Sequence, residues 1–519
     1  MTKLNVARLA AIIAILCFAA VPPLWADWPS YQHDMARSGV TTETLELPLA
    51  EKWTFIGNGP AIPAWQDPQD VAIEGNIEEP RVRFDAAYHA AMADGLVYFG
   101  TSCDNKIYCI DGETGAEVWS VMTGGPVRLA PTLSGGRVYV GSDDGIIYCL
   151  DGKDGSEVWR FYAAPTPEKV LARGKMTNLH PPRTGVLVDD GVAYFGAGIF
   201  PGERVYLYAV NAEDGSLVWK NDTISDGGAG QNGFSPQGYM LATNDTLYVP
   251  SGRATPAAFN RATGKFIHQR SYSWRSVGQV GGTYALLAGD HLFTGTGQVI
   301  GYDAKSGNIG FAWFKGRRLV VTQDTSYMLG AGGLKALNRV EYPTLSNQQR
   351  DVAARRKAIE AAKAEDMDDQ LEKLKEEEDT LNEALEACSL WNLDQEEFAT
   401  MIVAGELVIA GGNGNVVVVD GKSGESLWGA AIEGNAEGLA VSDGRLVVST
   451  DAGTVHCFGT GAATANEVGA ADGAEIDDEL TAVYADAAQD IVDQTGVEEG
   501  FCLVLGSGQG RLAHEFSKI

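Results

Sequence analysis

The feature of this sequence that most restricts its fold is a repeat of strands and tight turns, clearest over residues 136–159. Val138–Val140 alternates as a half-buried strand does, and Asp143–Gly145 supplies the positive φ that a tight hairpin needs. The next strand, Ile146–Leu150, leads through a turn to a third strand that ends on Trp159. With the strand before it, the unit predicts a four-stranded propeller blade, whose tryptophan fills the wedge beside the neighbouring blade.

The second turn of this unit recurs along the chain: an Asp or Asn, a Gly four residues later and a Trp four residues after that. Clear copies begin at Asp111, Asp151, Asn211 and Asp420, and weaker ones at Asn260 and Asp303. Asn338 and Gly459 are turn starts that no tryptophan follows at this spacing. The first five starts along the chain are 40, 60, 49 and 43 residues apart, which brackets the roughly 40 to 45 residues of a blade. We therefore predict an all-β, eight-bladed β-propeller, with seven blades as the alternative if the Asn338 unit is not a blade.

The two weaker copies depart from the pattern at the aromatic position. His268 stands where the tryptophan is expected in one, and Trp313 comes two residues late in the other. The long interval around residues 160–185 predicts an elaborated loop.

The last unit lacks its final strand, because no tryptophan follows Gly453–Gly459. At the other end of the chain, Leu47–Phe55 has the tryptophan, Trp53, but no preceding turn. An N-terminal strand that completes the last blade would close the ring and remove exposed sheet edges. We expect the propeller to span residues 27–460.

One blade contains a charged segment, residues 346–388, that is almost free of Gly and Pro. Its apolar residues follow a heptad-like spacing at Leu371, Leu374, Leu381, Leu385 and Cys388. This pattern predicts a coiled-coil helical hairpin inserted into the outer turn of the blade, with its tip near residues 365–369. The hairpin is either a solvated decoration or a partner-binding arm.

The N-terminus has the charge, apolar core and small-residue exit of a secretory signal peptide over residues 1–26. The apolar run is too short to span a bilayer, so we expect cleavage, no transmembrane domain afterwards, and a periplasmic or extracellular protein. The formal charge of −30 argues against a nucleic-acid partner, since no counterion release would offset the repulsion.

Catalytic and metal-binding patterns are missing from the sequence. It contains no Gly-x-Ser-x-Gly nucleophile elbow, no His-Glu-x-x-His zinc motif and no phosphate-binding P-loop. Cys109, Cys149 and Cys457 share one repeated strand position, which suits small buried hydrophobes rather than metal ligands. We therefore name no catalytic residue and no metal ligand.

Residues Tyr148–Trp159 resemble the tryptophan-docking repeat of the pyrroloquinoline-quinone (PQQ) propeller superfamily, and Trp28–Gly39 resembles the lead-in of its exported members. The superfamily includes quinone-dependent alcohol dehydrogenases and non-enzymatic propellers such as the scaffold of the outer-membrane barrel-assembly machinery. The resemblance implies, for the enzymes, an adjacent cysteine pair against the quinone and a calcium held by Glu, Asn and Asp. This sequence has no Cys-Cys pair, so PQQ with calcium is disfavoured. We expect a non-catalytic binding or scaffolding module, with a PQQ-dependent dehydrogenase as the alternative.

Polar residues in the first half of the chain precede or interrupt the expected innermost strands, where side chains point to the channel mouth. We predict that Asp85, His89, Arg128 and Arg183 line one pocket there for a protein partner or a small ligand. Other candidates near such strands are His180, Ser235–Gln237 and Arg253. Hydrogen bonding between blades is the alternative role of all these residues.

The C-terminus predicts an acidic linker over residues 461–478 and a short α/β fragment over residues 479–519. Gly506, Gly508 and Gly510 lie between an apolar strand and a helix start, and resemble the first motif of class I S-adenosylmethionine (SAM)-dependent methyltransferases. The acidic strand end that would hold the ribose is missing, so this segment cannot catalyse methyl transfer alone. SAM would bind only if the chain were the propeller half of a longer methyltransferase fusion.

Overall fold

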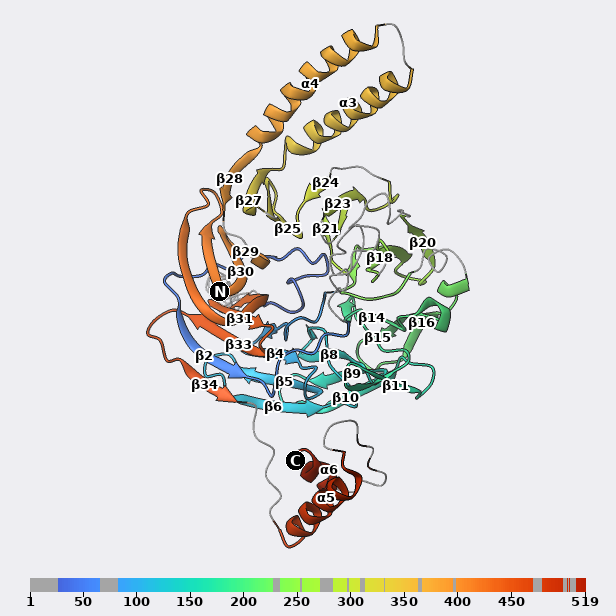
Figure 1. The fold of residues 1–519 in the computed structure, drawn as a ribbon, viewed down its shortest axis with the longest axis vertical. Coiled ribbons are helices and arrows are strands. Elements are labelled where there is room, and N and C mark those ends of the chain that lie inside the picture. The colour runs from blue at the N-terminus through green and yellow to red at the C-terminus, as the bar shows by residue number, and fades with distance from the viewer. Residues whose placement is uncertain are drawn as a thin grey trace, which may run out of the picture.

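The computed structural model describes residues 27–65, 83–226, 234–252, 254–270, 283–295, 298–308, 313–330, 332–362, 366–394, 398–469, 478–497, 502, 504 and 510–519. Within these residues the chain is mainly β, and its small antiparallel sheets follow one another around a common centre (Figure 1). The innermost strands of consecutive sheets contact one another, so the sheets pack face to face near this centre. The prediction of a mainly β, propeller-like fold is confirmed.

Six sheets of the described part contain four strands each, in chain order from the centre outward. The first contains β3 (Ala91–Ala93), β4 (Leu96–Gly100), β5 (Lys106–Asp111) and β6 (Glu117–Met122). The second contains β7 (Thr132–Ser134), β8 (Arg137–Ser142), β9 (Ile146–Asp151) and β10 (Glu157–Tyr162). The third contains β13 (Leu187–Asp189), β14 (Val192–Ala197), β15 (Tyr206–Asn211) and β16 (Leu217–Asn221).

The next three sheets repeat this arrangement. The fourth contains β17 (Leu241–Ala242), β18 (Thr246–Val249), β19 (Ala257–Asn260) and β20 (Phe266–Gln269). The fifth contains β21 (Ala285–Ala288), β22 (His291–Thr294), β23 (Gln298–Asp303) and β24 (Trp313–Lys315). The sixth contains β25 (Arg318–Val321), β26 (Thr325–Gly330), β27 (Gly333–Asn338) and β28 (Ser389–Leu393).

A final sheet of eight strands combines two strands near the N-terminus with six later in the chain. It contains β1 (Val40–Thr41), β29 (Phe398–Ala404), β30 (Leu407–Asp420), β31 (Ser426–Ser442), β32 (Arg445–Thr450), β33 (Thr454–Gly459), β2 (Ala50–Ile56) and β34 (Asn466–Gly469), in that spatial order. The pairing of β2 with β33 places Trp53 opposite Cys457. β2 therefore lies beside the last strand of the final repeat, where the closing strand is predicted, and closure of the ring stays a prediction.

The C-terminal edge of this sheet corrects the predicted linker. Residues 461–478 were expected to leave the propeller, but β34 pairs in parallel with β2 and extends the sheet by one strand. The hydroxyl of Thr464 also donates to the carbonyl of Lys52 at 2.6 Å. The acidic and alanine-rich composition concealed this strand, because its pairing depends on an N-terminal partner about 400 residues away.

The recurring turn is explained by the contacts around Trp159. Asp151 accepts a hydrogen bond from the backbone N–H of Lys153 at 2.9 Å and so closes the turn. Gly155 adopts a φ of 72°, which glycine adopts without strain. A β-bulge between Glu157 and Trp159 then turns the indole toward the next sheet.

The tryptophan of a sheet contacts the following sheet. Among the side chains that the structure describes, the indole N–H groups of six such tryptophans donate to backbone carbonyls: Trp53 to Gly112, Trp119 to Gly152, Trp159 to Ala212, Trp219 to Arg261, Trp391 to Gly421 and Trp428 to Leu49. His268 substitutes for the indole as predicted, with its Nε2 2.9 Å from the carbonyl oxygen of Ala304. The turn glycine packs under the ring of the preceding tryptophan, and a Cβ at Gly215 would lie 2.9 Å from Trp159.

The charged segment forms two antiparallel helices, α3 (Tyr342–Ala362) and α4 (Met367–Ala387), between β27 and β28. The helices extend outward from the ring (Figure 1). Val352 of α3 packs with Leu374 and Leu381 of α4 in a small separate core. The helical segment begins at Tyr342, four residues before the predicted start, and the sheet keeps its fourth strand.

The N-terminal segment from Trp28 to Thr41 crosses the ring and hydrogen-bonds to several inner strands. The carbonyl of Pro29 accepts from Leu133 at 2.7 Å, and the carbonyl of Ala36 accepts from Leu287 at 2.9 Å. The guanidinium of Arg37 donates to the carbonyl of Met240 at 2.9 Å. The lead-in therefore ties the second, fourth and fifth sheets together.

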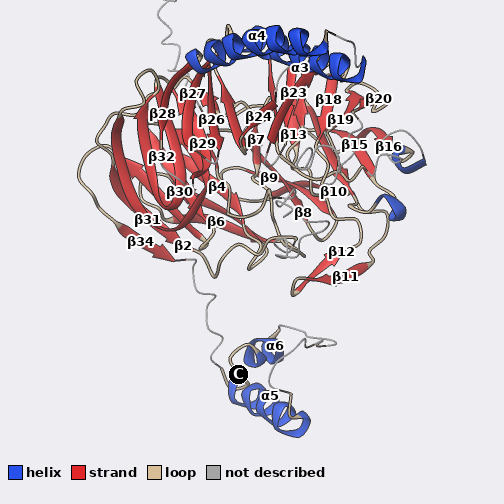
Figure 2. Ribbon diagram, turned by 45° about the horizontal axis from the view of Figure 1, so that its top comes forward, coloured by secondary structure: helices blue, strands red, loops and turns tan. Residues whose placement is uncertain are grey.

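The remaining elements lie between or after the sheets. The predicted loop around residues 160–185 contains a two-stranded ribbon, β11 (Lys169–Ala172) and β12 (Lys175–Asn178), which extends beyond the neighbouring sheets (Figure 2). Short 3₁₀ turns, η1 and η2, occupy Pro201–Glu203 and Ile224–Asp226. After β34, the chain forms α5 (Thr481–Thr495) and α6 (Arg511–Phe516).

Several predicted features lie outside the described residues. These are the signal peptide over residues 1–26, Arg253, Gly506 and Gly508. Gly510 is described and precedes α6 with a φ of 78°. No helix among the described residues is long and apolar enough to cross a membrane.

The repeated strand cysteines are confirmed as small core residues. Cys109, Cys149 and Cys457 are all fully buried and none forms a disulfide. Burial raises the pKa of Cys109 and Cys457 to about 12 and that of Cys149 to about 11. These thiols are therefore neutral near neutral pH.

Candidate functional site

Three of the four predicted mouth residues meet in a buried ion network, together with Asp143. Arg128 donates through Nε to Asp143 at 2.6 Å and approaches Asp85 through Nη1 at 3.2 Å. Arg183 donates to both oxygens of Asp143, at 3.0 and 2.9 Å. All four side chains are at most 4 % exposed. Two guanidinium and two carboxylate groups thus balance in charge.

Three of the four residues of the buried ion network lie in the connections that lead into the first three sheets. Asp85 and Arg128 precede β3 and β7, the innermost strands of the first two sheets, and Arg183 precedes β13 of the third. Asp143 lies in the turn between β8 and β9. The network therefore joins the first three sheets at one face.

Asp143 was not predicted as a site residue because an aspartate is a common residue in a tight turn. Its neighbour Asp144 makes the hydrogen bond within the turn, since its carboxylate accepts from the backbone N–H of Ile146 at 3.0 Å. The partners of Asp143 are 15 and 40 residues away in sequence. One indication of the role of Asp143 was present in the sequence: the turn contains two aspartates, although one is enough for the hydrogen bond within it.

The two carboxyl groups of the network differ in acidity. Burial favours the neutral form of Asp143, but Arg183 and Arg128 outweigh it and hold its pKa below the usual range. Burial raises the pKa of Asp85, and the attraction of Arg128 offsets only part of this effect. Asp143 is therefore the main counter-ion of both guanidinium groups.

A segment without regular secondary structure, Gly57–Trp65, lies over this network, and we call it the strap. The backbone N–H of Ala64 donates to Asp85 at 2.7 Å, and Arg128 donates to the carbonyl of Ile62. The backbone N–H of Ile62 donates to the hydroxyl of Ser102 at 2.7 Å.

The end of the strap is held by a side chain. The indole of Trp65 donates to Gln237, before β17, at 2.7 Å. Its ring packs edge-on against Phe200, with the centroids 6.1 Å apart. Gln237 belongs to the predicted Ser235–Gln237 group, and its amide in turn donates to Ser235 at 2.7 Å.

His89 lies apart from the buried ion network in its contacts. Its ring packs edge-on against Tyr31 at 5.0 Å and against Tyr239 at 6.4 Å, between ring centroids. Burial lowers the pKa of His89 to about 4, so the ring is neutral at physiological pH. His180 also makes a structural contact, with its Nε2 2.7 Å from the carbonyl oxygen of Glu203.

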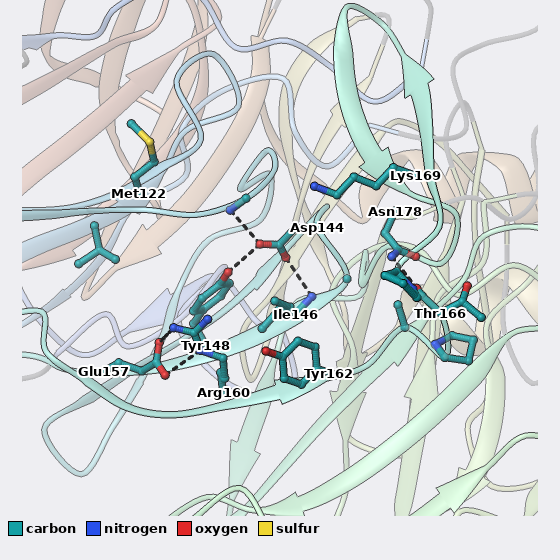
Figure 3. A pocket seen from close by; sticks show the side chains of 16 residues that line it. Met122, Asp144, Ile146, Tyr148, Glu157, Arg160, Tyr162, Thr166, Lys169 and Asn178 are labelled. Atoms are coloured by element: carbon teal, nitrogen blue, oxygen red, sulfur yellow. Dashed lines mark hydrogen bonds and ion pairs between the residues drawn. The ribbon is translucent and has the colours of Figure 1, made fainter. Parts of the chain in front are cut away.

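The structure also contains a hollow of about 680 Å³, which we call the outer hollow (Figure 3). The outer strands of the first two sheets and the start of the β11–β12 ribbon form it. Tyr148 donates to Asp144 at 2.6 Å on one side, and Arg160 pairs with Glu157 on another. Met122 and Tyr162, both 68 % exposed, add apolar surface. Sequence reasoning did not find this hollow, because its walls come from separate repeats.

The described side chains near the centre do not fit a quinone and calcium site. The sequence has no adjacent cysteines, and the described residues contain no group of three His, Cys, Asp or Glu side chains placed to hold a metal ion. Asp85 and Asp143 are carboxylates that could serve as ligands, but Arg128 and Arg183 already neutralise them. A calcium ion would need oxygen ligands not already paired with cations.

Solved structures share the fold of this chain at low sequence identity. Quinohemoprotein alcohol dehydrogenase from Comamonas testosteroni matches with a TM-score of 0.54 and 14 % identity, over 90 % of this chain and 85 % of that one. A europium-containing methanol dehydrogenase matches with a TM-score of 0.54 and 12 % identity, over 84 % and 98 %. The quinohemoprotein alcohol dehydrogenase ADHIIG from Pseudomonas putida HK5 gives 0.53 and 13 %, over 90 % and 85 %. These likenesses show the propeller fold alone.

The sequence itself matches a family model rather than any single characterised protein. No curated protein matches the chain. The model of the outer membrane protein assembly factor BamB matches residues 63–310, 203–438 and 412–465. These overlapping matches cover most of the chain and stop before α5, so nothing in them supports the methyltransferase resemblance of the C-terminal segment. The chain belongs to the family of the outer membrane protein assembly factor BamB, a family of PQQ-repeat propellers.

Proposed function

We propose that this chain is an exported, non-catalytic propeller that binds a protein partner during outer membrane protein assembly. The description of its family supports this role, as does the poor fit of its central residues to a quinone site. We further propose that residues 1–26 act as a signal peptide and that the protein works in the periplasm at the cell envelope.

We also propose eight blades. Six correspond to the four-stranded sheets. The eight-stranded sheet supplies two more, because β31 pairs with β30 through Ser426–Asn435 and with β32 through Ala436–Ser442. In this arrangement β2 is the outer strand of the eighth blade.

The single observation that carries the partner-binding role is the α3–α4 hairpin. In the first four sheets five residues connect the third and fourth strands, as residues 152–156 do between β9 and β10. The hairpin occupies the same connection with residues 339–388, and Trp391 after it still donates to Gly421. The sheet therefore does not need the hairpin, so we propose that it serves binding.

The charge of α4 indicates the kind of partner. Six acidic residues follow one another three or four positions apart on the side away from Leu374 and Leu381, and all are exposed: Asp369, Glu372, Glu376, Asp379, Glu383 and Glu386. Arg355 and Arg356 of α3 instead pair with Glu377 and Glu378. A basic protein surface would complement this acidic stripe.

The test replaces residues 339–388 with the five-residue turn of residues 421–425. Purified from detergent-solubilised envelopes of its own cells, the wild-type protein should carry an outer membrane assembly component that mass spectrometry identifies. The turn variant should lose that component while its urea-unfolding midpoint stays close to that of wild type. A matched variant that keeps the hairpin but carries Glu376→Gln, Asp379→Asn and Glu383→Gln should bind more weakly and with less dependence on salt. Equal recovery of the component with the turn variant would refute the proposal.

A further inference from the structure

Side chains of the face beneath the strap hold it mainly through hydrogen bonds to its main-chain N–H and carbonyl groups. Two of its N–H groups, on Ile62 and Ala64, donate to Ser102 and Asp85, both at 2.7 Å. The carbonyl of Ile62 accepts from Arg128. Gly59 contributes another carbonyl, which accepts from Tyr88 at 2.9 Å. None of these four bonds depends on the identity of a strap side chain.

Two positions of the strap are also held by polar contacts of their own side chains, and the amide of Asn58 donates to Asp104 at 2.9 Å. Trp65 offers its indole N–H to Gln237 and its ring to Phe200. Ala64, the residue before it, is 7 % exposed and packs with Phe84 and Leu129. A larger side chain at this position would therefore clash with its neighbours. The face therefore contacts main-chain groups of Gly59, Ile62 and Ala64, and it accommodates a small residue followed by an aromatic residue at positions 64 and 65.

The residues beneath the strap are fixed by buried ion pairs, and they include a hydrogen-bond donor that has no partner among the described residues. Arg128 and Asp85 are buried and fixed by Asp143 and Arg183, so they need no rearrangement to bind a main chain. Nη2 of Arg128 is buried and has no hydrogen-bond partner among the described residues. A buried guanidinium donor without a partner is costly, and an additional carbonyl or carboxylate oxygen would satisfy it.

The strap is also attached more weakly than the strand before it. β2 pairs with β33 along its length and with β34 through Trp53–Ile56. Gly57–Trp65 forms no strand pairing and relies on the separate bonds described above. Its displacement would leave the sheets of the ring intact.

We propose that this face is a receptor for a peptide segment of a partner protein, and that the strap occupies the receptor in cis. The partner segment would bring main-chain N–H and carbonyl groups, a small residue and then an aromatic residue. Asp85 and Arg128 would contact the peptide, and Arg183 would position Arg128 through Asp143. The α3–α4 hairpin takes no part, so this inference stands apart from the proposed function.

The test uses a fluorescein-labelled peptide with the strap sequence, residues 57–65, and fluorescence anisotropy. Wild type should bind it weakly, because the strap competes. Trp65→Ala removes the side-chain anchor of the strap, and this variant should bind the peptide at least tenfold more tightly. Tyr162→Ala, on the outer hollow, is the matched control and should behave as wild type does. Methylation of the peptide nitrogens that correspond to Ile62 and Ala64 should weaken binding at least tenfold.

A second measurement needs no substitution. Hydrogen–deuterium exchange of the wild-type protein with excess peptide should speed exchange at Ile62 and Ala64 and leave the strands protected. The proposal is overturned if Trp65→Ala binds the peptide no better than wild type, or if the methylated peptide binds equally well. Exchange of straps between two copies, seen as a dimer without peptide binding, would also overturn it. The variant that lacks residues 339–388 should bind the peptide normally, which separates this result from that of the hairpin test.

Discussion

Removal of Asp143 should destabilise the protein far more than removal of an exposed carboxylate. In Asp143→Ala, two buried guanidinium groups lose charged hydrogen bonds of 2.6, 2.9 and 3.0 Å, and only Asp85 remains as a counter-ion, for Arg128. Breaking a buried ion pair by deleting one partner typically costs about 3–5 kcal/mol. The matched control is Glu157→Ala, since the Glu157–Arg160 pair is 35 % and 45 % exposed, and such pairs contribute about 0–1 kcal/mol.

The assay is equilibrium urea unfolding followed by tryptophan fluorescence. The difference between wild type and Asp143→Ala should also depend on pH. Because the folded-state pKa of Asp143 is lowered, its stabilisation is present above the unfolded-state pKa of about 3.9 and is lost as the pH falls through the folded-state value. The two proteins should therefore converge in acid. A loss below about 1 kcal/mol at pH 7, equal to that of Glu157→Ala, would refute the assigned role of the buried ion network.

Three further outcomes are expected. Gly155→Ala and Gly174→Ala both place a Cβ at a φ of 72°, but only Gly155 would bring it within 2.8 Å of the Trp119 ring. Gly174→Ala should cost about 1–2 kcal/mol and Gly155→Ala clearly more, so equal unfolding midpoints would contradict the packing described. Truncation after residue 460 should lower the melting temperature and promote aggregation by exposing the edge of β2, whereas truncation after residue 470 should not, as calorimetry and light scattering can measure. Brief iodoacetamide treatment at pH 8 should modify exposed Cys502 and spare Cys457, whose pKa is raised to about 12; mass spectrometry that finds both labelled would contradict its burial.

The parts of the fold that the sequence predicted well are those whose causes are local. The turn at Asp151, its glycine and Trp159 lie within nine residues, and the structure uses each as expected. The pairing of β2 with the last repeat was also anticipated, since Trp53 follows no turn of its own. β34 and the crossing segment after Trp28 depend on distant partners, and no local pattern marked them.

The candidate site was predicted in part for the same reason. Charged residues before inner strands drew attention to Asp85, Arg128 and Arg183, and these three do meet. The residue that joins them, Asp143, looked like an ordinary turn residue. His89 fits the same sequence rule, yet it packs among aromatic rings, because position along a strand does not specify which way a side chain turns.

The pairing of β2 with β33 also constrains how the protein folds. Trp53 finds its partner Cys457 only after nearly all of the intervening chain is available. Contacts so distant in sequence form late and slow folding. Until then the sheet at the end of the growing chain has an open edge, which is exposed during synthesis. Folding should therefore show a slow final phase that a substitution in β2 lengthens and a substitution in the α3–α4 hairpin leaves unchanged.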